Sequence, residues 1–306
     1  MSDLFVHTFA QMGTVVSMQI VGHGTSQRAR RDRTRGINRA VAWFERIEAV
    51  CSRFAAHSEL RQLSTRVGMA VPVSPLLFEA VQFALAVADE THGAFDPTVG
   101  HRMEARGFNR EYRSGDVVQS RIDAPDDVSY RDVELDVGAR TITLHRPLLL
   151  DLGAVAKGLA VDMAARELAP FVNFAVDAGG DVFLGGHNAE GGTWTVGIRH
   201  PRDATQMLET LQISERAVCT SGDYARHVPG QVAAHHIMQP LTGASTTTVA
   251  SVTVVATSAM IADAFATAAF VLGPVDGLAL LERHELRGMI VTPALERVAT
   301  TGFADA

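Results

Sequence analysis

Residues 258–273 carry the sequence SAMIADAFATAAFVLG, which is apolar on nearly every side of a helix and contains one charge, Asp263. The serine at its start and the Gly-Pro pair that follows its apolar residues predict where this helix begins and ends. Before it, residues 249–256 include apolar side chains that alternate with small polar ones, as a strand does. We therefore predict a strand followed by a buried helix.

The single acid of this helix has a hydroxyl partner one turn away. Asp263 and Thr267 are four residues apart, so they share one helix face. A carboxylate among apolar side chains is costly to bury unless it is paired or binds a metal. Together the two side chains can give two oxygen ligands to Mg²⁺, which keeps phosphates and waters as further ligands. Two interpretations stay open from this segment alone: a metal site, or an acid at the helix edge in contact with water.

The composition is that of an acidic globular protein. The chain has 306 residues and a formal net charge of −7, which argues against broad electrostatic attraction to nucleic acid. The run RARRDRTRGINR at 28–39 is interrupted by an acid, so it predicts a solvated helix face. Cys51 and Cys219 are too few and too far apart for a zinc motif, and we expect reduced thiols.

Targeting signals are not apparent. Residues 1–14 lack a basic segment followed by a continuous apolar core, so no signal peptide is predicted. Residues 249–273 are long enough to cross a bilayer, but a strand and a buried helix explain their pattern better than a membrane span. We therefore expect a cytoplasmic protein without a membrane span.

The rest of the chain mixes strands and helices. Helices are predicted at 35–50, from Ser74-Pro75 to His92-Gly93, at 154–169 and after Pro274. Strands are predicted at 15–21, 133–145 (a hairpin), 172–176, 181–184, 194–198, 207–213, 216–220, 288–292 and 296–300. Because runs of strands separate from helices, the α+β class is favoured. We find no linker or strict repeat, so we predict a single domain over residues 1–306, built of two closely packed lobes.

Several polar clusters interrupt this pattern. GAFDPT at 93–98 follows a helix end, LDLGAVAKG at 150–158 leads from a strand into a helix, and DAGGD at 177–181 places two glycines between acids. Small residues allow a ligand to approach the backbone closely, but a loop, a surface lysine and a hairpin turn would explain the same patterns. The histidine pair at 235–236 offers a natural base near neutral pH, although a histidine beside a loop is more often structural.

The order of these blocks carries more information than any one of them. In sequence and in order, they resemble the ApbE family of FAD:protein FMN transferases: MGT at 12–14, CSRFAAHSEL at 51–60, GAFDPTVG at 93–100, LDLGAVAKGLAVD at 150–162, DAGGD at 177–181, TSGDYAR at 220–226, HHIMQPLTG at 235–243 and ADAFAT at 262–267. The resemblance extends from about Met12 to Gly273 and covers most of the chain.

The resemblance implies a fold and a reaction. The fold is α+β, a duplicated, T-fold-like sheet-and-helix core with the flavin bound between its halves. Family members hold FAD with Mg²⁺, transfer its FMN half to a Ser or Thr hydroxyl of an acceptor flavoprotein, and release AMP. We expect the same activity here. The alternatives are a FAD pyrophosphatase that yields FMN and AMP, and a flavin-binding protein without catalysis.

The resemblance also implies roles for single residues. His236 matches the family's catalytic base, and the implied Mg²⁺ ligands are Asp263, Thr267 and the backbone carbonyl of Ala154. Contacts to FAD are implied for the other matched positions, which are Met12, Phe54, Ala94, Phe95, Asp96, Asp151, Lys157, Gly179, Gly180, Asp181 and Ile237.

Three places depart from the family pattern. Gln239 stands where the family commonly has Asp, Leu159 replaces a usual aromatic residue, and the segment His101 to Phe108 matches its block loosely. None of these departures falls on the implied base or metal ligands. They leave the details of the pocket and the choice of acceptor open.

Overall fold

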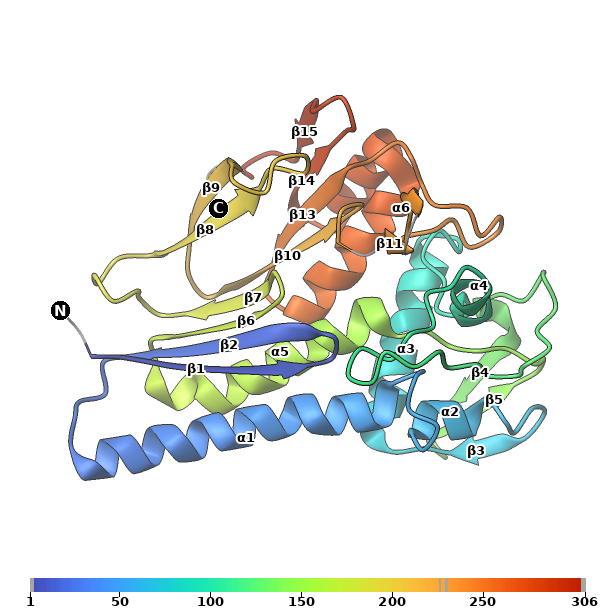
Figure 1. Ribbon diagram of the computed structural model, residues 1–306, viewed down its shortest axis with the longest axis horizontal. Helices are drawn as coiled ribbons and strands as arrows, with labels where there is room; N and C mark the ends of the chain where they lie inside the picture. Colours follow the sequence, from blue (N-terminus) through green and yellow to red (C-terminus); the bar gives the residue numbers. More distant parts are fainter. Residues whose placement is uncertain (1–2, 226, 229–230, 304–306) are drawn as a thin grey trace.

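The computed structural model describes residues 3–225, 227–228 and 231–303. Its centre is an antiparallel sheet with the strand order β1-β2-β6-β7-β10-β13-β14-β15 (Figure 1). The strands are β1 (Leu4–Gln11), β2 (Thr14–Val21), β6 (Phe174–Ala178), β7 (Asp181–Gly185), β10 (Arg216–Gly222), β13 (Ser251–Ala256), β14 (Arg287–Val291) and β15 (Arg297–Ala299).

Three long helices lie together beside this sheet (Figure 1). They are α1 (Gln27–Cys51), α5 (Gly153–Leu168) and α6 (Ala259–Arg283). Helix α5 contacts both α1 and α6. The main core joins their apolar faces to one face of the sheet, and its members include Met18, Phe44, Val176, Val254 and Phe270. The residues of this core come from positions between Val16 and Ile290 of the chain. The organisation of the chain as a single domain stays a prediction.

The other face of the sheet is covered by the hairpin of β8 (Trp194–Arg199) and β9 (Met207–Ile213). Trp194 and Leu211 of the hairpin share a second apolar cluster with Val255 of β13. With both faces covered, every residue of β13 is buried, including its serine and threonine. Alternate side chains of β13 therefore point to the two faces of the sheet, and both faces are buried, so neither set of side chains faces solvent.

A smaller region packs beside the helices (Figure 1). It holds α2 (Glu59–Leu63), α3 (Pro75–Glu90), α4 (Gly100–Ala105), the 3-10 turn Tyr130–Asp132 and a sheet of β3 (Ala70–Pro72), β5 (Thr141–Leu144) and β4 (Val133–Asp136). A second 3-10 turn, Ala169–Phe171, follows α5, and the pair β11 (His227–Val228) and β12 (Gln231–His235) lies before β13. Strands and helices thus segregate, which confirms the α+β class.

Helix α6 begins and bends as its sequence indicates. The Ser258 side chain accepts a hydrogen bond from the Ile261 amide, as an N-cap does. Gly273 has φ 87° and ψ 179°, so the helix is interrupted there and restarts at Pro274. Among the described residues, α6 alone is long and apolar enough to cross a membrane, but most of its apolar window is buried inside the protein. Such a helix is weak evidence for a membrane span.

Two predictions near the N-terminus need correction. Helix α1 begins at Gln27, eight residues before the predicted start near 35, because Ser26 caps it by accepting a hydrogen bond from Ala29. The arginine-rich run is largely exposed, but Arg33 is buried and pairs with Asp3 at 2.7 Å. Strand β1 was not predicted; among the described strands it pairs with β2 alone, at the edge of the sheet, and every second residue from Leu4 to Ala10 is exposed.

Candidate active site

A lysine joins two buried aspartates where α5, β7 and α6 meet. The Lys157 ammonium contacts Asp181 and lies 3.5 Å from Oδ2 of Asp263. The aspartate side chains are only 2% and 8% exposed, and Lys157 is the only lysine of the chain. The interpretations of Asp263 as a solvated acid and of Lys157 as a surface lysine are therefore wrong. One cation compensates two carboxylates that would be costly to bury alone.

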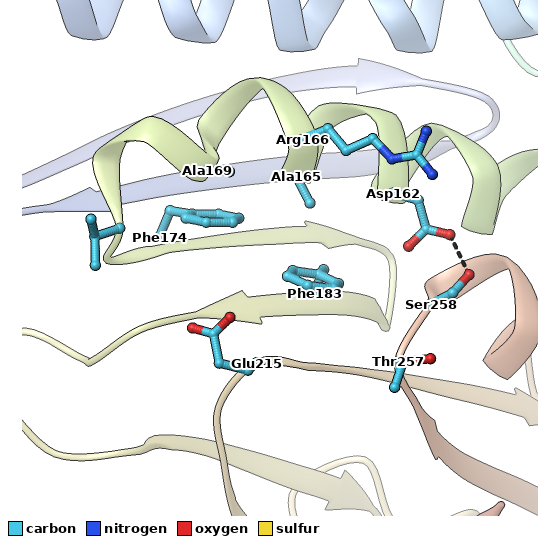
Figure 2. A pocket seen from close by; sticks show the side chains of 10 residues that line it. Asp162, Ala165, Arg166, Ala169, Phe174, Phe183, Glu215, Thr257 and Ser258 are labelled. Carbon is cyan, nitrogen blue, oxygen red and sulfur yellow. Dashed lines mark hydrogen bonds between the residues drawn. The ribbon is translucent and has the colours of Figure 1, made fainter.

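A close helix contact brings this cluster together. A Cβ at Gly158 of α5 would lie 2.5 Å from the carbonyl oxygen of Ala259, so only glycine allows α5 to approach the first turn of α6. Asp162, also on α5, accepts a hydrogen bond from Ser258 Oγ at 2.6 Å (Figure 2). It accepts another from the Ala259 amide at 2.7 Å. Burial raises the pKa of Asp162, while these hydrogen bonds act against the rise.

The implied ligands of a hard cation are three oxygen atoms carried by α5 and α6. Asp263 Oδ2 is buried and accepts no hydrogen bond within the described part of the chain. One turn along α6, Thr267 Oγ1 lies 3.0 Å from Ser221 Oγ of β10. Ala154 lies in the first turn of α5, three residues before Lys157.

This donor set fits Mg²⁺ better than zinc. Within residues 3–225, 227–228 and 231–303, no three His, Cys, Asp or Glu side chains gather as a metal site, whereas zinc sites need three or four such ligands. Mg²⁺ is commonly held by one or two carboxylates together with phosphates and waters. Asp263 can supply the single carboxylate, while its implied partners, the Thr267 hydroxyl and the Ala154 carbonyl, stay predictions.

Two tight turns stand side by side at one end of the sheet. Met12 (φ 53°) and Gly13 close the β1–β2 hairpin, and Gly179 (φ 66°) and Gly180 (φ 97°) close the β6–β7 hairpin. Because β2 pairs with β6, the two turns are neighbours, and a Cβ at Gly179 would lie 2.1 Å from Thr14 Oγ1. The double glycine thus forms a hairpin turn, and its backbone also approaches the Thr14 side chain closely. Asp181 follows this turn directly.

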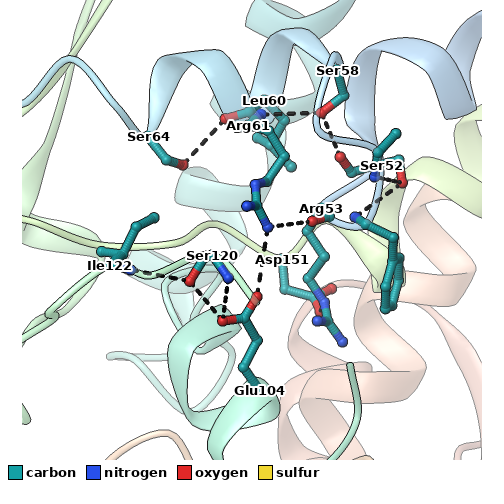
Figure 3. Close-up of polar contacts among 12 residues, drawn as sticks. Ser52, Arg53, Ser58, Leu60, Arg61, Ser64, Glu104, Ser120, Ile122 and Asp151 are labelled. Carbon is teal, nitrogen blue, oxygen red and sulfur yellow. Dashed lines mark hydrogen bonds and ion pairs between the residues drawn. The ribbon is translucent and has the colours of Figure 1, made fainter. Parts of the chain in front are cut away.

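A second acid–base pair lies at the start of α5. Asp151 accepts a hydrogen bond from Arg53 Nε at 2.5 Å, and both side chains are drawn in Figure 3. It accepts another from the Gly153 amide at 2.7 Å. The Arg53 guanidinium lies over the ring of Phe54, 4.2 Å from its centroid. Arg53 is buried and ties two of the predicted FAD-binding residues together. It was not predicted, although it stands in the quoted block CSRFAAHSEL at 51–60, beside the predicted Phe54.

The loop that carries Ala94, Phe95 and Asp96 is held firmly. Asp96 accepts hydrogen bonds from the amides of Thr98 at 2.8 Å and Tyr130 at 3.0 Å. Burial raises the pKa of Asp96, and the hydrogen bonds with Thr98 and Tyr130 oppose that rise. Phe95 belongs to the main core, with Ala94 partly buried against it. The carboxylate of Asp96 therefore shapes this loop, and its predicted contact with FAD stays a prediction.

The predicted base follows β12. Its neighbour His235 is buried, with Nε2 2.7 Å from the Thr246 carbonyl oxygen and its ring centroid 5.7 Å from that of Phe270. Ile237 belongs to the main core, and His236 between them is half-buried. Since Phe270 is on α6, the segment with His236 packs against the helix that carries Asp263 and Thr267. His235 thus fits a structural role, and the role of His236 as the base stays a prediction.

Neither cysteine is suited to act as a nucleophile. Cys51 and Cys219 are free and buried. Burial raises the pKa of Cys51 to about 12, and burial, reinforced by the charge of Asp263, raises that of Cys219 well above its usual value. Since the thiolate is the reactive form, covalent cysteine catalysis is not supported.

Two cavities open beside other residues than the predicted site residues, although Asp162, which binds the first turn of α6, borders the first of them. One of about 420 Å³ opens between α5, β6 and β7 and is bordered by Asp162, Arg166, Phe174, Phe183 and Glu215 (Figure 2). The other, of about 660 Å³, is bordered by Phe265 and His284. None of the predicted site residues lines either cavity.

These features define an α+β protein whose central sheet and helices enclose one lysine between two buried aspartates, with the Thr267 hydroxyl one turn along α6 from Asp263. The ApbE family pattern matches residues 12–290. The chain belongs to the ApbE family, as its sequence blocks predicted.

Relatives and solved structures agree with this assignment. The chain is 31% identical over 256 residues to a FAD:protein FMN transferase of Vibrio cholerae, covering 81% of this chain and 76% of that protein. It is 32% identical over 283 residues to one of Treponema pallidum, covering 84% and 77%. The crystal structure of the ApbE protein from Thermotoga maritima superimposes with a TM-score of 0.84, at 28% identity and 98% coverage of both chains. The flavin transferase ApbE from Vibrio cholerae gives 0.82, at 25% identity and 99% coverage of both.

Proposed function

We propose that this protein transfers the FMN part of FAD to an acceptor protein. Membership of the ApbE family and relatives named FAD:protein FMN transferase support the flavin transfer. The observation that carries the proposal is the cluster of Lys157, Asp181 and Asp263, beside the Thr267 hydroxyl. Such a cluster places fixed charges beside oxygen donors, as chemistry at a diphosphate requires.

We further propose the roles of single residues. A Ser or Thr hydroxyl of the acceptor attacks the phosphorus of the FMN half, the bond to the AMP phosphate breaks, and AMP leaves. His236 takes the proton of the attacking hydroxyl, which is otherwise a poor nucleophile. Bound to Asp263, Thr267 and the Ala154 carbonyl, Mg²⁺ would neutralise charge on the diphosphate. The cytoplasmic location stays a prediction.

Two other functions share the same site. A FAD pyrophosphatase would use water in place of the acceptor hydroxyl, and a flavin-binding protein would leave FAD intact. Incubation of the pure protein with FAD and Mg²⁺, with and without a Ser/Thr acceptor protein encoded beside its gene, separates the three. Transfer adds the mass of one FMN to the acceptor, hydrolysis releases FMN and AMP without acceptor, and storage leaves FAD unchanged in both mixtures.

Replacement of Asp263 by Ala tests the cation site. We expect turnover to fall and the Mg²⁺ concentration for half-maximal rate to rise by about tenfold or more, because even indirect partners of metal ligands change affinity by that factor. The measurement is a Mg²⁺ titration of AMP release. Asp276→Ala, at an exposed position of the same helix, is the matched control and should behave as the parent. A variant Asp263→Ala that needs no more Mg²⁺ than the parent would refute the ligand assignment.

A further inference from the structure

A single arginine connects the region of α4 to the loop that follows His236. Arg106 directly follows α4, and its guanidinium donates hydrogen bonds to the Gly243 carbonyl oxygen and to Ser245 Oγ, the latter at 3.2 Å. Ser245 Oγ in turn donates to the carbonyl oxygen of His235 at 2.7 Å. The contacts therefore run from Arg106 through Ser245 to the residue before His236.

The loop reached by Arg106 is closed on itself. The Gln239 amide donates to the Ala244 carbonyl at 2.8 Å, and the Gly243 amide donates back to the Gln239 carbonyl at 2.8 Å. On the far side, His235 Nε2 lies 2.7 Å from the Thr246 carbonyl oxygen. The segment with His236 is thus bonded to residues 244–246, which return from this loop, and Arg106 holds this returning segment through Gly243 and Ser245.

We propose that Arg106, acting through Ser245, is a positioning residue for His236. This inference rests on the proposed function, in which His236 is the base. A base must stay within hydrogen-bond reach of the hydroxyl it deprotonates, and loop segments are mobile unless they are tied down. Two charge-assisted hydrogen bonds from a planar guanidinium fix both the distance and the orientation of the loop.

The sequence did not point to this residue. Arg106 lies in the segment from His101 to Phe108, where the family resemblance is loosest. Nearby Arg102 does not share its role, because its guanidinium donates to the Asp126 carbonyl. Arg110, which donates to the Gly115 carbonyl at 3.0 Å, is exposed and provides a control.

The first test replaces Arg106 by Met. We expect kcat for FMN transfer to fall by about 10- to 100-fold, because small displacements of a catalytic group are costly. The Kd for FAD, measured by flavin fluorescence, should stay within about twofold of the parent, since Arg106 orients the base rather than the bound flavin. Arg106→Lys should recover part of the rate, because an ammonium can reach one of the two acceptors, and Arg110→Met should match the parent.

The second test uses Ser245, so that the inference does not depend on the folding of one variant. Ser245→Ala should lower kcat, and Ser245→Thr, which keeps the hydroxyl, should retain it. An unchanged kcat in Arg106→Met or in Ser245→Ala overturns the positioning role. A parent protein that flavinylates no acceptor would instead overturn the proposed function, and the inference with it.

Discussion

His236→Gly is expected to abolish transfer of FMN to the acceptor while FAD still binds. General base catalysis contributes about 10²- to 10⁴-fold, and a Ser or Thr hydroxyl has no other means of losing its proton among the residues we propose. His236 is half-buried and stands between His235, which is engaged with Thr246, and the core residue Ile237. Removal of its ring should therefore change the chemical step more than the surrounding fold.

The measurement combines two readouts on the same variant. Mass spectrometry follows FMN on the acceptor, and fluorescence titration follows the binding of FAD. Added imidazole should restore part of the rate by entering the space that the side chain leaves. His187→Gly, at an exposed position after β7, is the control. Normal flavinylation by His236→Gly would show that another group is the base.

Lys157→Met is expected to cause the largest loss of stability. It removes the cation between Asp181 and Asp263, whose side chains are 2% and 8% exposed. Breaking a buried ion pair by removing one partner costs about 3–5 kcal/mol, because the remaining charge stays buried without compensation. The free energy of unfolding in urea, without added Mg²⁺, measures this effect.

A second substitution shows whether uncompensated charge causes the loss of stability in Lys157→Met. Adding Asp181→Asn to Lys157→Met should recover part of the lost stability, since one uncompensated charge is removed with little change of shape. Arg166→Met, at an exposed position of the same helix, should change the free energy of unfolding by no more than about 0.5 kcal/mol. A loss below about 1 kcal/mol in Lys157→Met would mean that the carboxylates do not depend on this ammonium.

The local elements were largely predictable, and the exceptions have physical reasons. The helix that begins at Pro75, the hairpin of β4 and β5, and the strand before α6 all follow from caps, turns and hydrophobic period. The start of α1 was misplaced because its first turns are mostly polar, and only a cap and the buried Arg33 reveal them. Strand β1 was not predicted, because Gln11 is its only buried residue and its sequence therefore shows no strong apolar alternation.

The site was predictable as a set of residues but not as an arrangement. Asp263, Lys157 and Asp181 were singled out from their blocks, yet the sequence left a solvated acid and a surface lysine as open alternatives. Arg53 and Arg106 were missed, because each acts on atoms far away in the chain, at Asp151 and at Gly243. Such contacts have no period and no fixed spacing, so no local pattern can reveal them.

Local order along the chain was enough to establish the family, the helix with a lone acid, and the residue types available for chemistry. The pairing of one ammonium with two buried carboxylates depends on the packing of the folded chain, because it requires α5 to cross the first turn of α6 at Gly158. Burial depends on how the sheet and the helices pack together. Because Asp263 and Asp181 are buried, their charges are costly unless the Lys157 ammonium stays paired with them.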